Sequence, residues 1–211
     1  MTNLRKANFI HNRSLVLHLP LYEPDSASFL SRDAYGHLAT VTGASWRPRG
    51  RYFDGVDDYI ELPNSSLFAP ADGTIEVWIN LQSTQGEAYL YSCNADNLSV
   101  FKAIDSASID LWYRGLLVLT VPCLPGTDNF SCISFTFSRG ALAYGYRNSE
   151  QIASATCSAL APTGGATTIG INNALNNYKF NGLMGEIRLY QRVLTPLEIQ
   201  QNYLATKWRY R

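Results

Sequence analysis

The sequence predicts an all-β domain: an antiparallel sandwich of two sheets with one short C-terminal helix. Three observations predict this class. Short stretches of alternating apolar and polar residues, separated by turn residues, recur along the chain. Hydrophobic residues make up 46% of the 211 residues and charged residues only 16%, which suits one domain with a large core. A helix start is clearly signalled only near the end of the chain.

The clearest strand is expected at residues 73–81. Its apolar and polar side chains alternate with a period of two, so they would face opposite sides of a sheet. One face would carry Ile75, Val77, Ile79 and Leu81, and the other Glu76, Trp78 and Asn80. The alternation therefore predicts a strand whose apolar face lies in the core.

Two hairpins and two further strands are expected after it. The first hairpin has a tight turn at Arg114-Gly115, and the second turns at 138–140. The expected hairpin pairs are 109–113 with 116–121 and 133–137 with 142–146, and the further strands are 167–171 and 185–190. These short strands predict a sandwich rather than alternating strands and helices.

The C-terminal helix is expected to begin at Thr195-Pro196-Leu197-Glu198. This is a capping box, in which the Thr195 hydroxyl accepts from the Glu198 amide and the Glu198 carboxylate reaches back. The helix should end near Leu204 and lie across an end or edge of the sandwich. The chain then divides into an N-terminal arm (1–13), a sandwich with its closing helix (14–205) and a solvated basic aromatic tail (206–211).

Five segments, in this order, resemble one known family. They are an opening strand at 15–22, a turn at 33–37, the hairpin GRYFDGVDDYI at 50–60, a strand at 74–80 and the closing strand at 180–190, which the capped helix follows. The chain is similar to the laminin-G-like jelly-roll domains of the concanavalin-A-like lectin/glucanase superfamily. The resemblance implies a concanavalin-A-like jelly-roll sandwich and says little about the ligand, because one fold hosts many functions.

The closing segment at 199–207 resembles stand-alone members of this family among tailed-phage structural proteins. This resemblance implies a decoration or fibre-associated protein on a virion surface, made in the host cytoplasm. Its partners would be neighbouring virion proteins or further copies of itself, and a glycan is an additional candidate.

Charge and targeting signals exclude other partners. Seventeen basic residues balance seventeen acidic residues, so no net field attracts nucleic acid. The apolar run at 15–21 is short and is interrupted by His18 and Pro20. We therefore expect no signal peptide and no membrane insertion.

The four cysteines show no metal-ligand spacing, and free buried thiols are expected. Cys123 and Cys132 flank a Pro-Gly-Thr-Asp-Asn turn. They could face each other across a hairpin, so a disulfide between them is the alternative.

The carboxylates predict no catalytic residues. Hydrolases of the concanavalin-A-like kind place two carboxylates in alternation on one strand, because acid and nucleophile must face the same sugar about 5 Å apart. Glu186 is a lone acid in its strand and no Glu-x-Asp-x-Glu pattern occurs. A hydrolase with a degenerate site remains the last of three functional alternatives.

The acidic cluster Asp54, Asp57, Asp58 and Glu61 is either a cation site or the chemistry of a turn, and turn chemistry is favoured. Many relatives hold a structural calcium with an Asp directly before the glutamate of the closing strand. Here Gly185 stands at that position. We therefore predict no cofactor and name no metal ligands, although structural calcium stays open, with Asp33 as one contributor.

A glycan site is expected in the loop Asn172-Asn173-Ala174-Leu175-Asn176-Asn177-Tyr178. Amide side chains suit sugar hydroxyls and an exposed tyrosine suits the apolar face of a sugar, so the candidate ligand-binding residues are Asn172, Asn173, Asn176, Asn177 and Tyr178. The alternative is that asparagine is simply a favoured loop residue. A weaker candidate is the loop at 94–97.

The leading hypothesis is a non-catalytic structural or binding module of a virion surface. The first alternative is a free lectin-like carbohydrate-binding protein.

Overall fold

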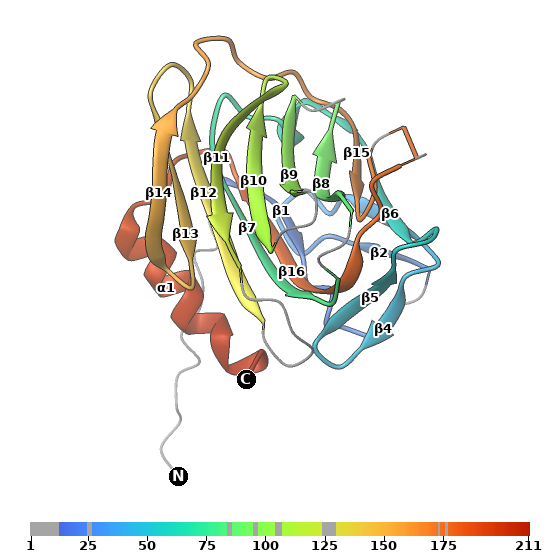
Figure 1. Cartoon of the computed structure of the whole chain (residues 1–211). Coiled ribbons are helices and arrows are strands. Elements are labelled where there is room, and N and C mark those ends of the chain that lie inside the picture. Colours follow the sequence, from blue (N-terminus) through green and yellow to red (C-terminus); the bar gives the residue numbers. More distant parts are fainter. Residues whose placement is uncertain are drawn as a thin grey trace.

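Two antiparallel sheets pack face to face (Figure 1). The computed structural model describes residues 13–24, 27–83, 86–94, 97–103, 107–123, 130–172, 174–175 and 177–211. Within these ranges each sheet has eight strands, and one α-helix follows the last strand. The predicted jelly-roll sandwich with a short C-terminal helix is confirmed. Of the predicted N-terminal arm, all but Arg13 lies outside the described residues.

Sheet A has the strand order β14-β13-β12-β7-β16-β5-β4, and β1 pairs with β16 beside this path. Its strands are β1 (Leu15–Leu19), β4 (Ser45–Arg47), β5 (Gly50–Asp54), β7 (Asp72–Leu81), β12 (Ser131–Ser138), β13 (Leu142–Arg147), β14 (Glu150–Thr156) and β16 (Asn181–Tyr190). The long strands β7 and β16 lie side by side at its centre, so segments far apart in the sequence form the middle of the sheet.

Sheet B has the order β11-β10-β9-β8-β15-β6-β3-β2. Its strands are β2 (Ser28–Leu30), β3 (Leu38–Thr42), β6 (Tyr59–Ser65), β8 (Ala88–Cys93), β9 (Leu98–Lys102), β10 (Ser108–Tyr113), β11 (Leu116–Pro122) and β15 (Gly165–Ile169). A 3-10 turn, η1 (Ser66–Phe68), follows β6. The predicted tight turn joins β10 to β11, with Arg114 and Gly115 both at positive φ.

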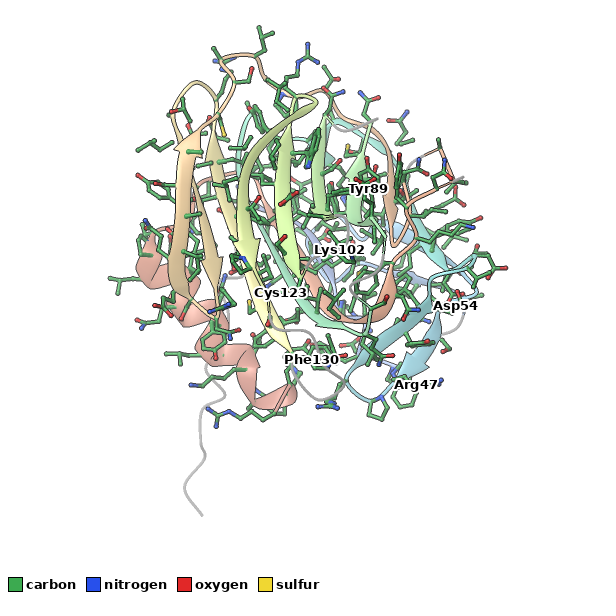
Figure 2. The ribbon with its side chains drawn as sticks, in the orientation of Figure 1. Arg47, Asp54, Tyr89, Lys102, Cys123 and Phe130 are labelled. Carbon is green, nitrogen blue, oxygen red and sulfur yellow. The ribbon has the colours of Figure 1, made fainter. Side chains whose placement is uncertain are left out.

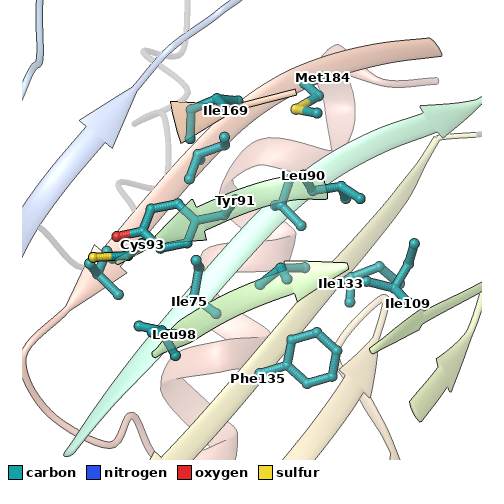
Figure 3. Close-up of a cluster of buried hydrophobic side chains, with 14 of the residues drawn as sticks. Ile75, Leu90, Tyr91, Cys93, Leu98, Ile109, Ile133, Phe135, Ile169 and Met184 are labelled. Atoms are coloured by element: carbon teal, nitrogen blue, oxygen red, sulfur yellow. The ribbon is translucent and has the colours of Figure 1, made fainter. Parts of the chain in front are cut away.

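The main hydrophobic core lies between the two sheets (Figure 3). The apolar face of β7 points into it, and Ile75, Val77, Ile79 and Leu81 are each at most 2% exposed. Side chains from sheet B, including Leu90, Val100 and Ile109, meet them there. The alternation in β7 therefore predicted the core face correctly.

The C-terminal helix α1 (Pro196–Thr206) begins with the predicted capping box. It lies across the outer face of sheet A, rather than across an end or edge of the sandwich as predicted (Figure 1). The helix takes this position because Glu76 and Trp78, on the outer face of β7, form hydrogen bonds with it and are buried beneath it. Among the described residues, no helix combines the length and apolar character needed to cross a lipid bilayer.

The predicted solvated tail is wrong, because the last residues dock on sheet A. A 3-10 turn, η2 (Lys207–Arg209), leads to Tyr210, whose side chain is only 4% exposed. Its ring stacks on Trp78 and also lies against Phe130, with ring centroids 4.2 Å and 4.9 Å away. A large aromatic on the outward face of a central strand gains apolar contact when the tail covers it.

All four cysteines are free and buried, as expected. Cys123 belongs to the main core between the sheets, whereas Cys132 packs with Trp78 and Tyr210 on the outer face of sheet A. The two side chains therefore lie on opposite faces of one sheet. The alternative disulfide between them is wrong for this reason.

Candidate functional site

The asparagine-rich loop between β15 and β16 folds over the outer face of sheet B. The Tyr89 amide donates to the Tyr178 carbonyl oxygen at 2.9 Å, and the Phe180 amide donates to the Gly170 carbonyl oxygen at 2.8 Å. Tyr178 has a φ of +60°, in the left-handed region that bulky residues rarely adopt. These hydrogen bonds hold the strained residue in place and set its side chain on β8 and β9.

Tyr178 completes a groove of about 220 Å³ on sheet B. We call it the aromatic groove, and its lining residues are Glu87, Tyr89, Phe101, Trp112 and Tyr178. Tyr89, which Figure 2 labels, and Phe101 are cross-strand neighbours on β8 and β9. Trp112 comes from β10, where it pairs with Ser99.

The rings of the aromatic groove meet edge to face. The Tyr89 and Phe101 centroids are 4.7 Å apart, and Tyr178 lies 5.8 Å from the first and 6.0 Å from the second. Trp112 adds a contact at 6.3 Å to Phe101. Tyr178 keeps 44% of its surface exposed and Trp112 is half-buried, so both offer aromatic surface to a ligand.

Two carboxylates accompany these rings. Glu87 lines the aromatic groove itself. Asp110 pairs with Phe101 across β9 and β10 and is 6% exposed. Burial raises the pKa of Asp110 above its ordinary value, against a hydrogen bond from the Thr120 hydroxyl at 2.6 Å. Asp110 is thus occupied within the sheet, whereas Glu87 adds a hydrogen-bond acceptor to the apolar ring surface of the groove, a combination that suits a sugar ring.

The structure places the predicted site residues in two different roles. Tyr178 lies in the aromatic groove, whereas Asn172 and Asn177 close the loop on each other. The Asn177 amide donates to Asn172 Oδ1 at 3.3 Å, and the Asn172 amide donates to the Asn177 carbonyl oxygen at 3.4 Å. Asn173 and Asn176 lie outside the described residues.

Four groove residues were missed in the sequence: Glu87, Tyr89, Phe101 and Trp112. A signal was present for one of them, since Trp112 shares the outward face of its strand with Asp110. An aromatic residue on the outward face of a strand that is not covered indicates a binding surface. Tyr89 and Phe101 gave no such signal, because their approach to Tyr178 depends on a long-range loop contact.

The weaker candidate loop serves the structure. Asn94 Nδ2 donates to the Thr163 hydroxyl at 2.8 Å, and Asn97 Oδ1 accepts from Arg114 at 2.9 Å. Both side chains therefore connect neighbouring loops. Ala95 and Asp96 lie outside the described residues.

Two aspartates of the acidic cluster make the hydrogen bonds of a turn. Asp54 Oδ1 accepts from the Val56 amide at 2.7 Å, and Asp58 Oδ2 accepts from the Asp54 amide at 2.8 Å. Asp54, Asp57 and Asp58 have oxygens within 4.8 Å of one another, while Glu61 lies on β6 and pairs with Thr168 of sheet B. Bonds of this kind favour the predicted turn role for these aspartates.

Asp33, the other residue considered for a cation, is also used by the backbone. Its two carboxylate oxygens accept from the amides of Tyr35 at 2.8 Å and His18 at 3.0 Å. At Gly185, a Cβ would lie 2.2 Å from Tyr210 Cε1. The docked tail therefore occupies the space beside this glycine, where the relatives' aspartate would project.

Glu186 lies in a buried ion cluster rather than in a cleft. Glu186 belongs to β16 and is fully buried, with His18 Nε2 at 3.5 Å, Arg188 Nη1 at 3.6 Å and Arg209 Nη1 of the docked tail at 3.7 Å from its oxygens. Arg188 also meets Glu76, at 3.1 Å. Burial raises the pKa of Glu186, but the charges of Arg188, His18 and Arg209 outweigh it and hold that pKa below the ordinary value. These contacts give Glu186 a structural role beneath the docked tail.

The comparison with protein families matches residues 54–200 to a laminin-G-like model described as the concanavalin A-like lectin/glucanases superfamily. The match spans more than two thirds of the chain. The chain belongs to this superfamily. The resemblance to laminin-G-like domains is thereby confirmed, whereas the likeness to phage proteins stays a prediction.

Solved structures share the superfamily's fold with this chain. A sialidase from Trypanosoma rangeli, solved in complex with sialic acid, superposes with a TM-score of 0.72 at 15% identity over 94% of this chain. The binding domain of botulinum neurotoxin serotype D gives 0.69 at 14% identity over 92% of it. The matches cover 34% of the sialidase and 52% of the toxin domain, so they speak for the fold alone. No curated protein sequence gave a significant match.

Proposed function

We propose that this chain is a non-catalytic carbohydrate-binding module whose aromatic groove takes a neutral sugar ring. The observation that carries the proposal is the exposed ring of Tyr178, held beside Trp112 and Glu87 on an outer sheet face. A sugar has an apolar face that stacks on aromatic rings and a rim of hydroxyls that bond to carboxylates.

The test is a calorimetric titration of the full chain with each member of a panel of neutral oligosaccharides. Tyr178→Ala and Trp112→Ala should each weaken the best ligand about tenfold or more, because each removes stacking surface at the centre of the site. Tyr35→Ala is the matched control, since Tyr35 is about as exposed as Tyr178 but stacks on His37 and does not line the aromatic groove. Equal loss in the control and the groove variants would contradict the proposal.

The absence of catalysis belongs to the same proposal. Glu186 is buried among cations on the outer face of sheet A and does not line the aromatic groove, whose described lining includes one carboxylate, that of Glu87. Hydrolysis needs two carboxylates facing the same sugar. Incubation with polysaccharides should release no reducing ends. Release of reducing ends by the parent chain, lost in Glu186→Gln, would contradict the non-catalytic assignment and favour the hydrolase alternative.

The setting that we propose for this module is a virion surface, where neighbouring virion proteins or further copies would hold it. Its support is the resemblance of the closing segment at 199–207 to phage structural proteins. Quantitative mass spectrometry of purified particles provides the test. A decoration or fibre protein should be present in tens to hundreds of copies, and its absence from particles would favour the free lectin alternative.

A further inference from the structure

A second hollow, of about 460 Å³, lies at the β4–β5 hairpin of sheet A. We call it the arginine pocket, and its lining residues are Arg47, Pro48, Arg49, Tyr52, Gln82 and Leu183. We propose that it binds a carboxylate-bearing sugar through Arg47 and Arg49. None of its residues lines the aromatic groove, so this inference is independent of the neutral sugar proposed there.

The hairpin holds the two arginines on either side of Pro48. β4 and β5 pair from Ser45 with Tyr52 to Arg47 with Gly50, which leaves Pro48 and Arg49 in the turn. Gly50 has a φ of +155°, and a Cβ there would lie 2.2 Å from the Met184 carbonyl oxygen. The glycine thus lets the hairpin lie against β16, which fixes the turn relative to the sheet.

The floor of the arginine pocket is the outer surface of sheet A. Tyr52 on β5 and Leu183 on β16 are direct cross-strand neighbours. Gln82 follows the end of β7 and supplies an amide at the side. The pocket therefore has an apolar floor, one neutral polar group and two cationic groups on the same hairpin.

The guanidinium groups of Arg47 and Arg49 each lie over an aromatic ring, and neither is paired with a described carboxylate. Arg47, near the lower edge of the molecule in Figure 2, lies over the Tyr52 ring at 5.8 Å, and Arg49 lies over the Phe130 ring at 5.4 Å. Within the part of the chain that the structure describes, no carboxylate forms an ion pair with either arginine. Arg47 Nη1 also donates to the Trp46 carbonyl oxygen at 3.2 Å. The other N–H donors lie in the plane of each guanidinium group, where a ligand can reach them.

These features select the class of ligand. A carboxylate accepts two parallel hydrogen bonds from an arginine fork. Tyr52 and Leu183 suit the apolar face of a sugar ring, and the Gln82 amide can both donate to and accept from hydroxyls. A bare inorganic anion would use the arginines and leave the floor uncovered. The volume lies within the range of about 300–1,000 Å³ for small-molecule sites.

The experiment titrates the full chain at low salt with glucuronate, glucose and inorganic sulfate, and follows binding by calorimetry. We expect saturable glucuronate binding that weakens as salt is added, with glucose and sulfate at least tenfold weaker. Arg47→Gln and Arg49→Gln should each weaken glucuronate at least tenfold, and Arg47→Lys should restore only part of the affinity because it lacks the fork.

Two matched controls keep the assignment specific. Arg139→Gln changes an arginine in the turn between β12 and β13, and Tyr178→Ala changes the aromatic groove, so both should leave glucuronate binding unchanged. Circular dichroism and thermal melting verify that the arginine variants fold. Absence of glucuronate binding, or binding that survives the double variant Arg47→Gln/Arg49→Gln, would overturn the proposal. Sulfate that binds as tightly as glucuronate would overturn the sugar assignment.

Discussion

Trp78 in the centre of β7 and Tyr210 near the end of the sequence stack with ring centroids 4.2 Å apart and planes 22° apart. Tyr203 of α1 lies on Trp78 as well, at 5.6 Å. The Trp78 indole N–H also donates to the Thr206 hydroxyl at 3.0 Å. The helix and the tail are therefore bound to the outer face of sheet A through one tryptophan, and they shield the ion cluster around Glu186 from water.

Removal of the Tyr210 ring should destabilise the whole domain. Tyr210→Ala opens a cavity over Trp78 and should lower the free energy of unfolding by about 3 kcal/mol, as for other buried aromatic truncations. Urea unfolding followed by tryptophan fluorescence measures it. Arg211→Ala changes an exposed neighbour and should stay within about 0.5 kcal/mol of the parent chain. Equal stability of Tyr210→Ala and the parent would show that the tail does not dock.

Gly185 should tolerate no side chain while Tyr210 is docked. Gly185→Ala places a Cβ against the ring at 2.2 Å and should cost about 2 kcal/mol of stability. The cost should shrink in a Tyr210→Ala background, because the ring that clashes is gone. A double variant whose loss equals the sum of the two single losses would contradict this coupling.

The capping box should make stability depend on pH in acid. The Glu198 carboxylate accepts from Arg192 and from the Thr195 amide, each at 2.9 Å, and these contacts lower the pKa of Glu198 from 4.5 to about 2. Because the folded pKa is depressed, this stabilisation is present above pH 4.5 and is lost as the pH falls towards 2.

Glu198→Gln tests that statement. Glu198 is partly exposed, so solvent screening limits the expected difference in unfolding free energy to about 1 kcal/mol at pH 7. The difference between the variant and the parent should vanish near pH 2. Denaturant titrations at several pH values measure it, and a difference that does not change with pH would contradict the assignment.

The fold was predictable from the sequence because its main signals are local. Alternation at Ile75, Val77 and Ile79 identifies the core face of β7, and the capping box at Thr195 identifies the start of α1 within a residue. What covers the opposite face of β7 was not predictable in this way. The alternation alone would place Glu76 and Trp78 in solvent. In the structure they contact Asn202 and Tyr210, which lie more than 120 residues further along the chain.

The candidate site was predictable in part for the same reason. Tyr178 could be singled out because loop composition is a local property. Its neighbours Tyr89 and Phe101 depend on the register of β8 with β9 and on the hydrogen bond from the Tyr89 amide to Tyr178. The arginine pocket likewise joins a hairpin at 45–54 to Leu183 through strand pairing alone. The spacing of residues in the sequence does not predict such pairings.

The cysteines should be unreactive in the folded chain. All four thiols are free and buried, and burial raises the pKa of Cys123 to about 11, so few thiolates form at neutral pH. A thiol reagent at pH 8 should label none of the cysteines within minutes in native buffer and all four in guanidinium. Detection of only two thiols after unfolding without reductant would indicate the disulfide that the structure contradicts.

The most direct test of the central claim uses the indole N–H of Trp112. The chain has four tryptophans, so a nitrogen-15 correlation spectrum has four indole signals that single substitutions assign. On addition of the best neutral oligosaccharide from the panel, the Trp112 signal should shift in a saturable way while the buried Trp78 signal stays in place. Saturable binding that leaves the Trp112 signal unmoved would contradict the aromatic groove as the sugar site.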